Sequence, residues 1–220
     1  MCGIFYILSK KKNNILNKQN LKYIIEKIKY RGPDYTNIVY DKNNIFIHTL
    51  LAIQGFNPQP YKTNNGLFLF NGEIYGTSSL KESIQKGVIN YNNITHKNES
   101  KFLEDFIENK NGLDKLDELD GEFVINYFDK KNNLLHIISD PFGTKPFCWY
   151  IDENNFIASS YESCVKKTIE LLNLNKNSKI EFIIPNTHYI FNLNNYKLIN
   201  KKEIIKWDFN PRFNNFDRWN

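Results

Sequence analysis

The chain has 220 residues, of which 41% are hydrophobic and 15% aromatic, and its formal net charge is +5. This apolar content excludes a disordered chain, and the scattered basic residues argue against a nucleic-acid-binding surface. Three cysteines without a Cys-x-x-Cys pair argue against a disulfide framework or a metal site, and favour a reducing, cytoplasmic compartment. No apolar run approaches the roughly 18 residues of a membrane span, so we expect no membrane partner.

The first part of the chain is predicted to form short buried strands and one amphipathic helix. Asn20 is a suitable cap for that helix, and apolar residues follow it at helical spacing as far as Lys29. The sequence Arg-Gly-Pro-Asp after the helix predicts a turn. The predicted elements are strands at 3–8, 45–48 and 67–70, helices at 20–29 and from Ser78 or Ser79, and a turn at 30–34.

The second part is predicted to consist mainly of strands, beginning with a hairpin whose turn covers residues 129–133. The predicted elements are strands at 121–128, 134–139, 147–150, 156–159, 182–184 and 188–191, and helices at 100–110 and 163–172. Few helices and many short strands predict an α+β fold with antiparallel sheets. We expect one domain over residues 1–206, followed by a tail or linker at 207–220 that lacks periodicity.

The first residues suggest a nucleophile. Methionine aminopeptidase removes Met1 when a small residue such as Cys2 follows, and the mature chain would then carry a thiol and a free α-amine on one residue. An α-amine has an ordinary pKa of about 7.7–8.0, so it can act as the general base for its own side chain. A cysteine in this place is more often a small apolar residue that begins a strand, and the other motifs decide between these interpretations.

Four separated motifs occur in the chain: Cys2-Gly3-Ile4, Arg31-Gly32-Pro33-Asp34, Asn71-Gly72-Glu73-Ile74-Tyr75 and Asp140-Pro141-Phe142-Gly143-Thr144-Lys145-Pro146-Phe147. Taken in order, they resemble the glutaminase domain of class II glutamine amidotransferases, most closely that of asparagine synthetases. The resemblance extends from residue 1 to about 200 and includes the stretches 119–123 and 158–162. It implies the N-terminal-nucleophile hydrolase fold, an αββα sandwich of two antiparallel sheets between helix layers.

The resemblance also implies roles for particular residues. Cys2 corresponds to the nucleophile that attacks the side-chain amide of glutamine. Asn71 and Gly72 correspond to the oxyanion hole, where an amide side chain and a backbone N–H stabilise the tetrahedral intermediate. An Asn-Gly dipeptide taken alone would more often be a hairpin turn.

Further residues correspond to structural parts of the site. Arg31 resembles an arginine that braces the N-terminal loop, and Asp34 belongs to the same supporting motif. We expect His48 to be structural, and Asp140 and Lys145 to hold the loop that contains them.

The glutamine-binding wall departs from the family pattern at two positions. Leu50 stands where the family has an arginine for the α-carboxylate, and Glu99 stands where it has an aspartate for the α-ammonium. Losing one charge-assisted contact weakens binding by about 1.5–3 kcal/mol, or one to two decades, and leaves neutral donors to meet the carboxylate. The expected substrate-binding residues are Leu50, Leu51, Ala52, Ile53, Gln54, Glu73 and Glu99.

The leading hypothesis is an enzyme that hydrolyses L-glutamine to glutamate and ammonia for an ATP-dependent, asparagine-synthetase-like subunit or domain. The sequence has no phosphate-binding motif, so we expect ATP and magnesium only in that partner and no cofactor in this chain. Two alternatives stay open. The substitution at Leu50 suggests a catalytically impaired regulatory or structural remnant, and a third possibility is an amidohydrolase for another amide.

Overall fold

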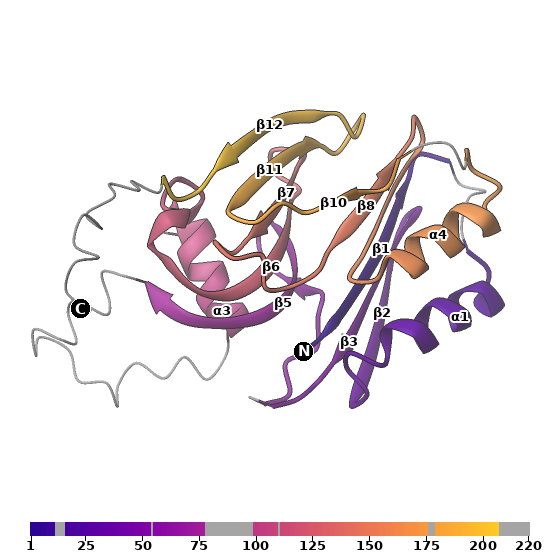
Figure 1. Ribbon diagram of the computed structural model, residues 1–220, viewed down its shortest axis with the longest axis horizontal. Coiled ribbons are helices and arrows are strands. Elements are labelled where there is room, and N and C mark those ends of the chain that lie inside the picture. Colours follow the sequence, from indigo (N-terminus) through magenta and orange to yellow (C-terminus); the bar gives the residue numbers. More distant parts are fainter. Residues whose placement is uncertain (12–15, 54, 78–98, 110, 176–178, 207–220) are drawn as a thin grey trace, which may run out of the picture.

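Two antiparallel sheets form the body of the computed structural model, which describes residues 1–11, 16–53, 55–77, 99–109, 111–175 and 179–206. Sheet A contains β1 (Gly3–Ser9), β2 (Tyr35–Asp41), β3 (Asn44–Leu50), β8 (Cys148–Ile151), β9 (Asn155–Ser159) and β10 (Glu181–Phe182). Sheet B contains β4 (Tyr61–Lys62), β5 (Gly66–Thr77), β6 (Leu119–Asp129), β7 (Leu134–Ser139), β11 (Thr187–Asn192) and β12 (Leu198–Glu203). The strand orders are β10-β8-β9-β1-β3-β2 and β12-β11-β7-β6-β5-β4 (Figure 1).

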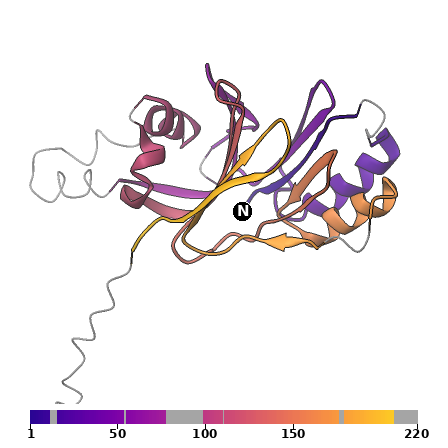
Figure 2. The ribbon, with the colours of Figure 1, turned by 90° about the horizontal axis from the view of Figure 1, so that it is seen from above.

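Helices cover the outer face of each sheet. Helices α1 (Lys18–Ile28) and α4 (Glu162–Leu171) pack on sheet A. Helix α3 (Glu99–Glu104) continues into the π-helical turn η2 (Asp105–Asn109) and packs on sheet B. Figure 2 shows the helix pair and α3 on opposite sides of the two sheets. This arrangement confirms the predicted αββα sandwich. Two 3-10 turns, η3 (Gly112–Asp114) and η4 (Leu116–Glu118), lead into β6.

Strand β1 is buried along its whole length because it lies inside sheet A, with apolar layers on both of its faces. Ile4 and Tyr6 point into the core between the sheets, whereas Phe5 and Ile7 point into the core under α1 and α4. A strand that is buried on both faces reads as a continuous apolar run, which explains why this segment was readily predicted. The central strand therefore presents its first residue at one end of the sandwich.

Several element boundaries differ from the sequence predictions. Helix α1 is capped by Asn17 instead of Asn20, because the Asn17 side chain accepts a hydrogen bond from the Asn20 backbone N–H at 2.8 Å. The helix predicted at 100–110 changes to π-helical geometry after Glu104. Strands β2 and β12 were not predicted, since both are edge strands with few buried side chains. The helix from Ser78 or Ser79 and the tail at 207–220 lie outside the described residues.

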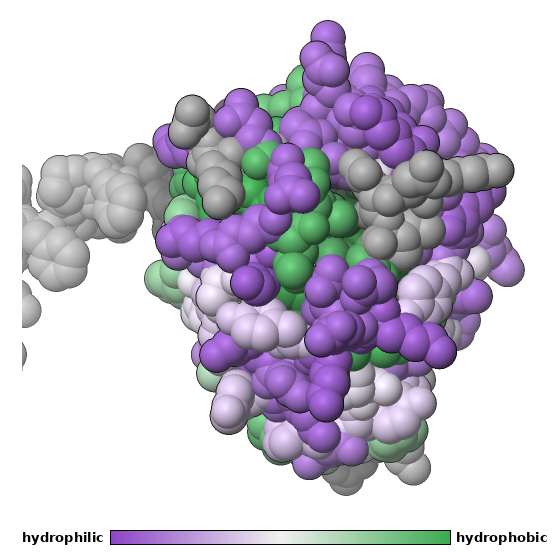
Figure 3. Space-filling model, turned by 90° about the vertical axis from the view of Figure 1, so that its right-hand side faces the viewer, coloured by the Kyte–Doolittle hydropathy of each residue, from purple (hydrophilic) through white to green (hydrophobic). Residues whose placement is uncertain are grey.

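The end of the molecule that carries α1 and α4 is largely hydrophilic, with apolar side chains visible in a band between polar ones (Figure 3). Leu172 and Leu174 are among the partly buried apolar residues that pack against the core beneath these helices. No helix within the described residues is long and apolar enough to cross a membrane.

Three buried histidines make the fold sensitive to acid. Burial lowers the pKa of His48 and of His136 from 6.5 to about 4, and that of His188 to about 3. The fold therefore favours the neutral rings. Their contribution to the free energy of unfolding is fully present above pH 6.5 and is lost as the pH falls toward 4. Each histidine contributes about 1.4 kcal/mol per pH unit in this window. Urea unfolding at pH 7 and pH 5 should show a steep fall in the free energy of unfolding.

The substitution His48→Leu provides the control. Neither ring nitrogen of His48 has a hydrogen-bond partner among the described residues, so leucine leaves no buried polar group unpaired. The variant should lose about 2 kcal/mol less than the parent between pH 7 and pH 5. An identical pH dependence in the two proteins would contradict a neutral, buried His48.

Candidate active site

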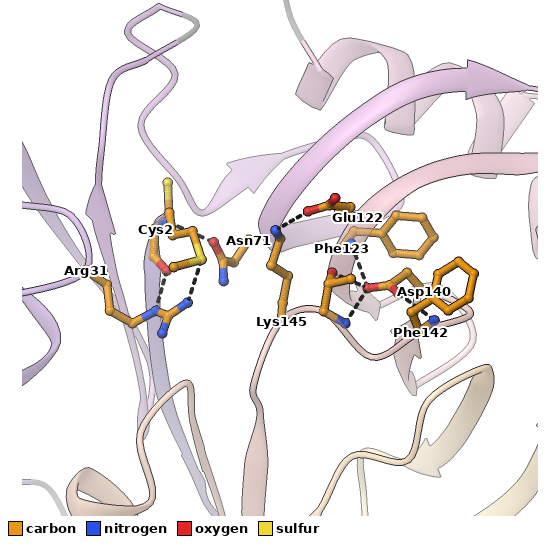
Figure 4. A network of polar contacts seen from close by, with 10 residues as sticks. Cys2, Arg31, Asn71, Glu122, Phe123, Asp140, Phe142 and Lys145 are labelled. Atoms are coloured by element: carbon orange, nitrogen blue, oxygen red, sulfur yellow. Dashed lines mark hydrogen bonds and ion pairs between the residues drawn. The ribbon is translucent and has the colours of Figure 1, made fainter.

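Cys2 lies where the two sheets meet, just before the first residue of β1. Its backbone N–H donates a hydrogen bond to the Asn71 side-chain oxygen Oδ1 at 2.8 Å. Cys2 is half-buried and Asn71, on β5, is fully buried. Figure 4 shows the two side chains next to one another, with Arg31 on the far side of Cys2. One hydrogen bond thus joins the start of sheet A to the middle of a strand in sheet B.

The orientation of the Asn71 amide leaves a donor available. Because the oxygen accepts from Cys2, the NH2 group points the other way, and Nδ2 is buried without a partner among the described residues. A buried amide donor without a partner costs free energy unless a ligand or water meets it. Asn71 therefore has an unused hydrogen-bond donor and is bonded directly to Cys2 through its oxygen.

Gly72 follows Asn71 within β5 and has no space for a side chain. It pairs with Phe123 on β6, and a Cβ atom added to it would lie 2.0 Å from the Glu122 carbonyl oxygen. The dipeptide is therefore part of a strand ladder, and the alternative that Asn71-Gly72 forms a hairpin turn is wrong. Glycine allows the backbone of β5 to approach β6 closely at this point.

Arg31 and Asp34 brace two neighbouring loops. The Arg31 Nε donates to the Cys2 carbonyl oxygen at 3.1 Å, and its guanidinium lies over the ring of Tyr161, 5.4 Å from the centroid. The Asp34 carboxylate accepts from the Ala52 backbone N–H at 2.8 Å. These contacts fit the supporting roles expected from the second motif.

A pocket of about 130 Å³ opens beside Cys2. Of the residues predicted to bind the substrate, Leu50, Leu51, Ile53 and Glu73 line this pocket, whereas Ala52 is not among the lining residues. Gln54 and the side chain of Glu99 lie outside the described residues. The lining residues are Met1, Cys2, Leu50, Leu51, Ile53, Gly55, Asn57, Gln59, Phe70, Gly72, Glu73 and Lys145.

Six of these lining residues were not among the expected site residues: Met1, Gly55, Asn57, Gln59, Phe70 and Lys145. Gln59 is 3% exposed, and its side-chain oxygen accepts from the Phe70 backbone N–H at 2.6 Å. It thereby holds the loop after β3 against β5. Residues 57–59 have no pattern that distinguishes them from an ordinary loop, but Lys145 belongs to the fourth motif and could have been considered.

The Asp140 carboxylate organises the loop that follows β7. It accepts hydrogen bonds from the backbone N–H groups of Phe123, Phe142 and Thr144 at 3.0, 2.8 and 3.0 Å, and from the Thr144 hydroxyl at 2.6 Å. It is fully buried, and its interactions are therefore strong because the acceptor is charged. Asp140 thus has the loop-holding contacts expected from the sequence, and it ties the loop to β6.

The described residues contain no group of three or more His, Cys, Asp or Glu side chains that could hold a metal ion. The other two cysteines are buried, and burial raises the pKa of the Cys148 thiol to about 12 and that of Cys164 to about 11. His48 is buried without a hydrogen-bond partner within the described residues, as expected for a structural residue. Cys2 is the one cysteine of the chain that lines the pocket.

The two-sheet sandwich, with a central strand that begins next to a half-buried cysteine, has the architecture of N-terminal-nucleophile hydrolases. Residues 1–200 match the family described as "Glutamine amidotransferase domain", and the chain belongs to that family. Two solved structures show the same fold at 16% sequence identity. Each match covers 94% of this chain and 50% of the other protein's chain. They are an allosteric regulatory enzyme of purine biosynthesis (TM-score 0.62) and a glutamine phosphoribosylpyrophosphate amidotransferase from Bacillus subtilis (TM-score 0.60).

Among curated proteins, the chain is similar to asparagine synthetases described as glutamine-hydrolysing. It is 31% identical to a putative one from Methanocaldococcus jannaschii, over 93% of this chain and 44% of the relative. It is 28% identical to one from Bacillus subtilis, over 73% of this chain and 26% of the relative. The chain therefore spans less than half the length of these relatives.

The close approach at Gly72 generates a test of the site's geometry. Gly72→Ala forces the new Cβ against the Glu122 carbonyl, so we expect a loss of at least about 3 kcal/mol. For a chain of this size, that loss lowers Tm by roughly 6–12 °C. Differential scanning calorimetry measures the change.

Gly55→Ala is the matched control. Both glycines have positive φ angles, +151° at Gly72 and +115° at Gly55, but the nearest atom to a Cβ at Gly55 is 4.0 Å away. Only backbone strain of about 1 kcal/mol is expected there. Equal losses of Tm in the two variants would show that the contact with β6 is unimportant.

Proposed function

We propose that this amidotransferase domain hydrolyses L-glutamine to glutamate and ammonia, with Cys2 as the nucleophile. The observation that carries the proposal is the hydrogen bond from the Cys2 N–H to Asn71 Oδ1, which leaves the NH2 group of this neighbouring side chain unused. A nucleophile adjacent to a buried, oriented donor is the arrangement that acyl transfer requires. The pocket alongside these residues provides the space for a side-chain amide.

The proposed reaction begins after Met1 is removed. The neutral α-amine of Cys2 takes the thiol proton, and Sγ attacks the amide carbon of glutamine. The developing oxyanion accepts hydrogen bonds from Asn71 Nδ2 and from the Gly72 backbone N–H. The ammonium of Cys2 returns the proton to the leaving nitrogen, so ammonia departs and a thioester remains. Water, deprotonated by the same amine, then hydrolyses the thioester to glutamate and restores the thiol.

The ammonia would serve an ATP-dependent, asparagine-synthetase-like partner. Support comes from the relatives, which are described as glutamine-hydrolysing asparagine synthetases and are more than twice as long as the matched segment. The partner is either a separate subunit or a further domain, and it would hold the ATP and magnesium that asparagine formation needs. In this proposal the chain itself uses only Cys2 and hydrogen-bond donors.

The assay for the proposal is glutamate release from L-glutamine by the mature protein, whose loss of Met1 is checked by intact-mass spectrometry. We expect activity in the parent and none in Cys2→Ala. Iodoacetamide at pH 7.5 should add one carbamidomethyl group, on Cys2, and abolish activity. Cys148 and Cys164 are internal controls, because burial keeps both thiols protonated at this pH. Activity that survives in Cys2→Ala would overturn the proposed chemistry.

Asn71→Ala tests the oxyanion hole. Loss of one such donor lowers kcat by about 100- to 1000-fold with a smaller effect on KM. Asn126→Ala is the control, because Asn126 is an equally buried asparagine on β6 that contacts Tyr6 and the Leu69 carbonyl instead of Cys2. It should lower thermal stability but leave kcat within a few-fold of the parent. An effect of Asn71→Ala on KM alone would assign the residue to ground-state binding.

The same assays address the two alternatives from the sequence. A protein that turns over other amides but not glutamine would be an amidohydrolase of different specificity. A protein with no activity, alone or with a synthetase partner, would be an impaired remnant. The specific observation behind both alternatives is Leu50, which is 4% exposed and lines the pocket without any charge.

A further inference from the structure

The pocket beside Cys2 contains one cation among its described lining residues, and that cation is Lys145. It also contains one carboxylate, Glu73. An α-amino acid carries an α-carboxylate and an α-ammonium, so a pocket with one charge of each sign complements it. Leu50, in the same wall, supplies only apolar surface.

Lys145 is restrained by the contacts of the preceding residue and by the contact of its own ammonium. Thr144 donates through its backbone N–H and its hydroxyl to the buried Asp140 carboxylate, so the residue that follows has little freedom. The Lys145 ammonium then contacts Glu122 Oε2 at 2.8 Å. Figure 4 shows the side chain between Asn71 and the Asp140 loop, with its ammonium turned toward Glu122. The lysine is thus positioned in advance instead of extending into solvent.

The ion pair with Glu122 leaves hydrogen-bond donors of the Lys145 ammonium unused. An ammonium has three N–H donors, and the described contact with Glu122 uses one of them. The Lys145 side chain is 9% exposed, whereas the Glu122 side chain is 50% exposed and can remain solvated. Glu122 also lies directly opposite Glu73 in the β5–β6 ladder, where like charges repel. A cation paired with Glu122 therefore offsets this repulsion, and its remaining donors are available to a ligand.

We propose that Lys145 binds the α-carboxylate of the amino-acid substrate, in place of the arginine that Leu50 replaces. This inference rests on the proposed glutaminase function for the identity of the substrate. Arg31 is a poorer candidate, because its Nε is bonded to the Cys2 carbonyl and it is not among the lining residues. Neutral backbone donors after Leu50 are individually weaker than a charged group. Lys145 is then a specificity-determining residue in addition to a support for its loop.

The test compares two substrates: L-glutamine and 4-aminobutanamide, which is glutamine without its α-carboxylate. Lys145→Met removes the charge but keeps the length of the side chain. We expect KM for glutamine to rise about 10- to 100-fold, as for loss of one charge-assisted contact, while kcat changes little. The kcat/KM for 4-aminobutanamide should be unchanged. Adding Leu50→Arg to Lys145→Met should recover most of the lost affinity for glutamine.

Lys130→Met is the matched control. Lys130 also pairs with a carboxylate of another strand, Asp41, at 2.6 Å, but it is not among the residues that line the Cys2 pocket. Its substitution should leave both substrates unaffected. An equal loss on both substrates in Lys145→Met, or an unchanged KM for glutamine, would overturn the role of Lys145.

A binding measurement separates this inference from the proposed function. Isothermal titration calorimetry of L-glutamine with the Cys2→Ala protein requires no turnover, and Lys145→Met in that background should weaken binding by the same 10- to 100-fold. Lys145-dependent binding in a protein that releases no glutamate would support this inference and refute the proposed reaction. Glutamine binding that does not depend on Lys145, or an absence of glutamine binding, would refute the inference.

Discussion

The hydrogen bond between the Cys2 N–H and the Asn71 side-chain oxygen is the interaction on which the rest of the site depends. It connects the first residue before β1 to the middle of β5, and so fixes sheet A relative to sheet B at this end of the sandwich. The same bond decides which way the Asn71 amide faces. In the chain that retains Met1, the Cys2 backbone N–H can only donate, so the oxygen must meet Cys2 and the NH2 group must point elsewhere. The position of the thiol and the direction of the donor are therefore set together.

The two ends of this bond are held by different means. On one side, β1 is clamped to the segment after β9: the Ile4 N–H donates to the Ser160 hydroxyl at 3.1 Å, and the Ile4 carbonyl accepts from the Ser160 N–H at 2.9 Å. On the other side, β5 is pressed against β6 at Gly72, where any side chain would collide. The buried Asp140 carboxylate then attaches the next loop to β6. Rigid strands thus hold Asn71 and Gly72 in place, whereas the pocket beside Cys2 is lined by residues of β3 and β5 together with residues of the loops.

The α+β class of the fold and the four motifs could be recognised in the sequence, because both depend on local residue type. A run that is buried on both faces, such as β1, and a strongly alternating hairpin, such as β6–β7, are visible without any knowledge of the partner strands. The edge strands β2 and β12 were missed because they bury few side chains. The arrangement of charged side chains in the pocket could also not be predicted from the sequence. Lys145 was assigned to its loop alone, since nothing local shows that the chain reversal at Asp140 carries it to the wall that contains Leu50.

The separation of the clamping residues in the chain has a consequence for the newly made protein. Ile4 and Ser160 are 156 positions apart, and Cys2 and Asn71 are 69 apart. A ribosome releases β1 first, yet β1 cannot occupy its place between β3 and β9 until β9 has been synthesised. Contacts of such long range form late, because the chain entropy of closing the loop must be overcome before they contribute. The Cys2 thiol is therefore exposed early in a nascent chain, before Asn71 and the neighbouring strands have taken their places around it.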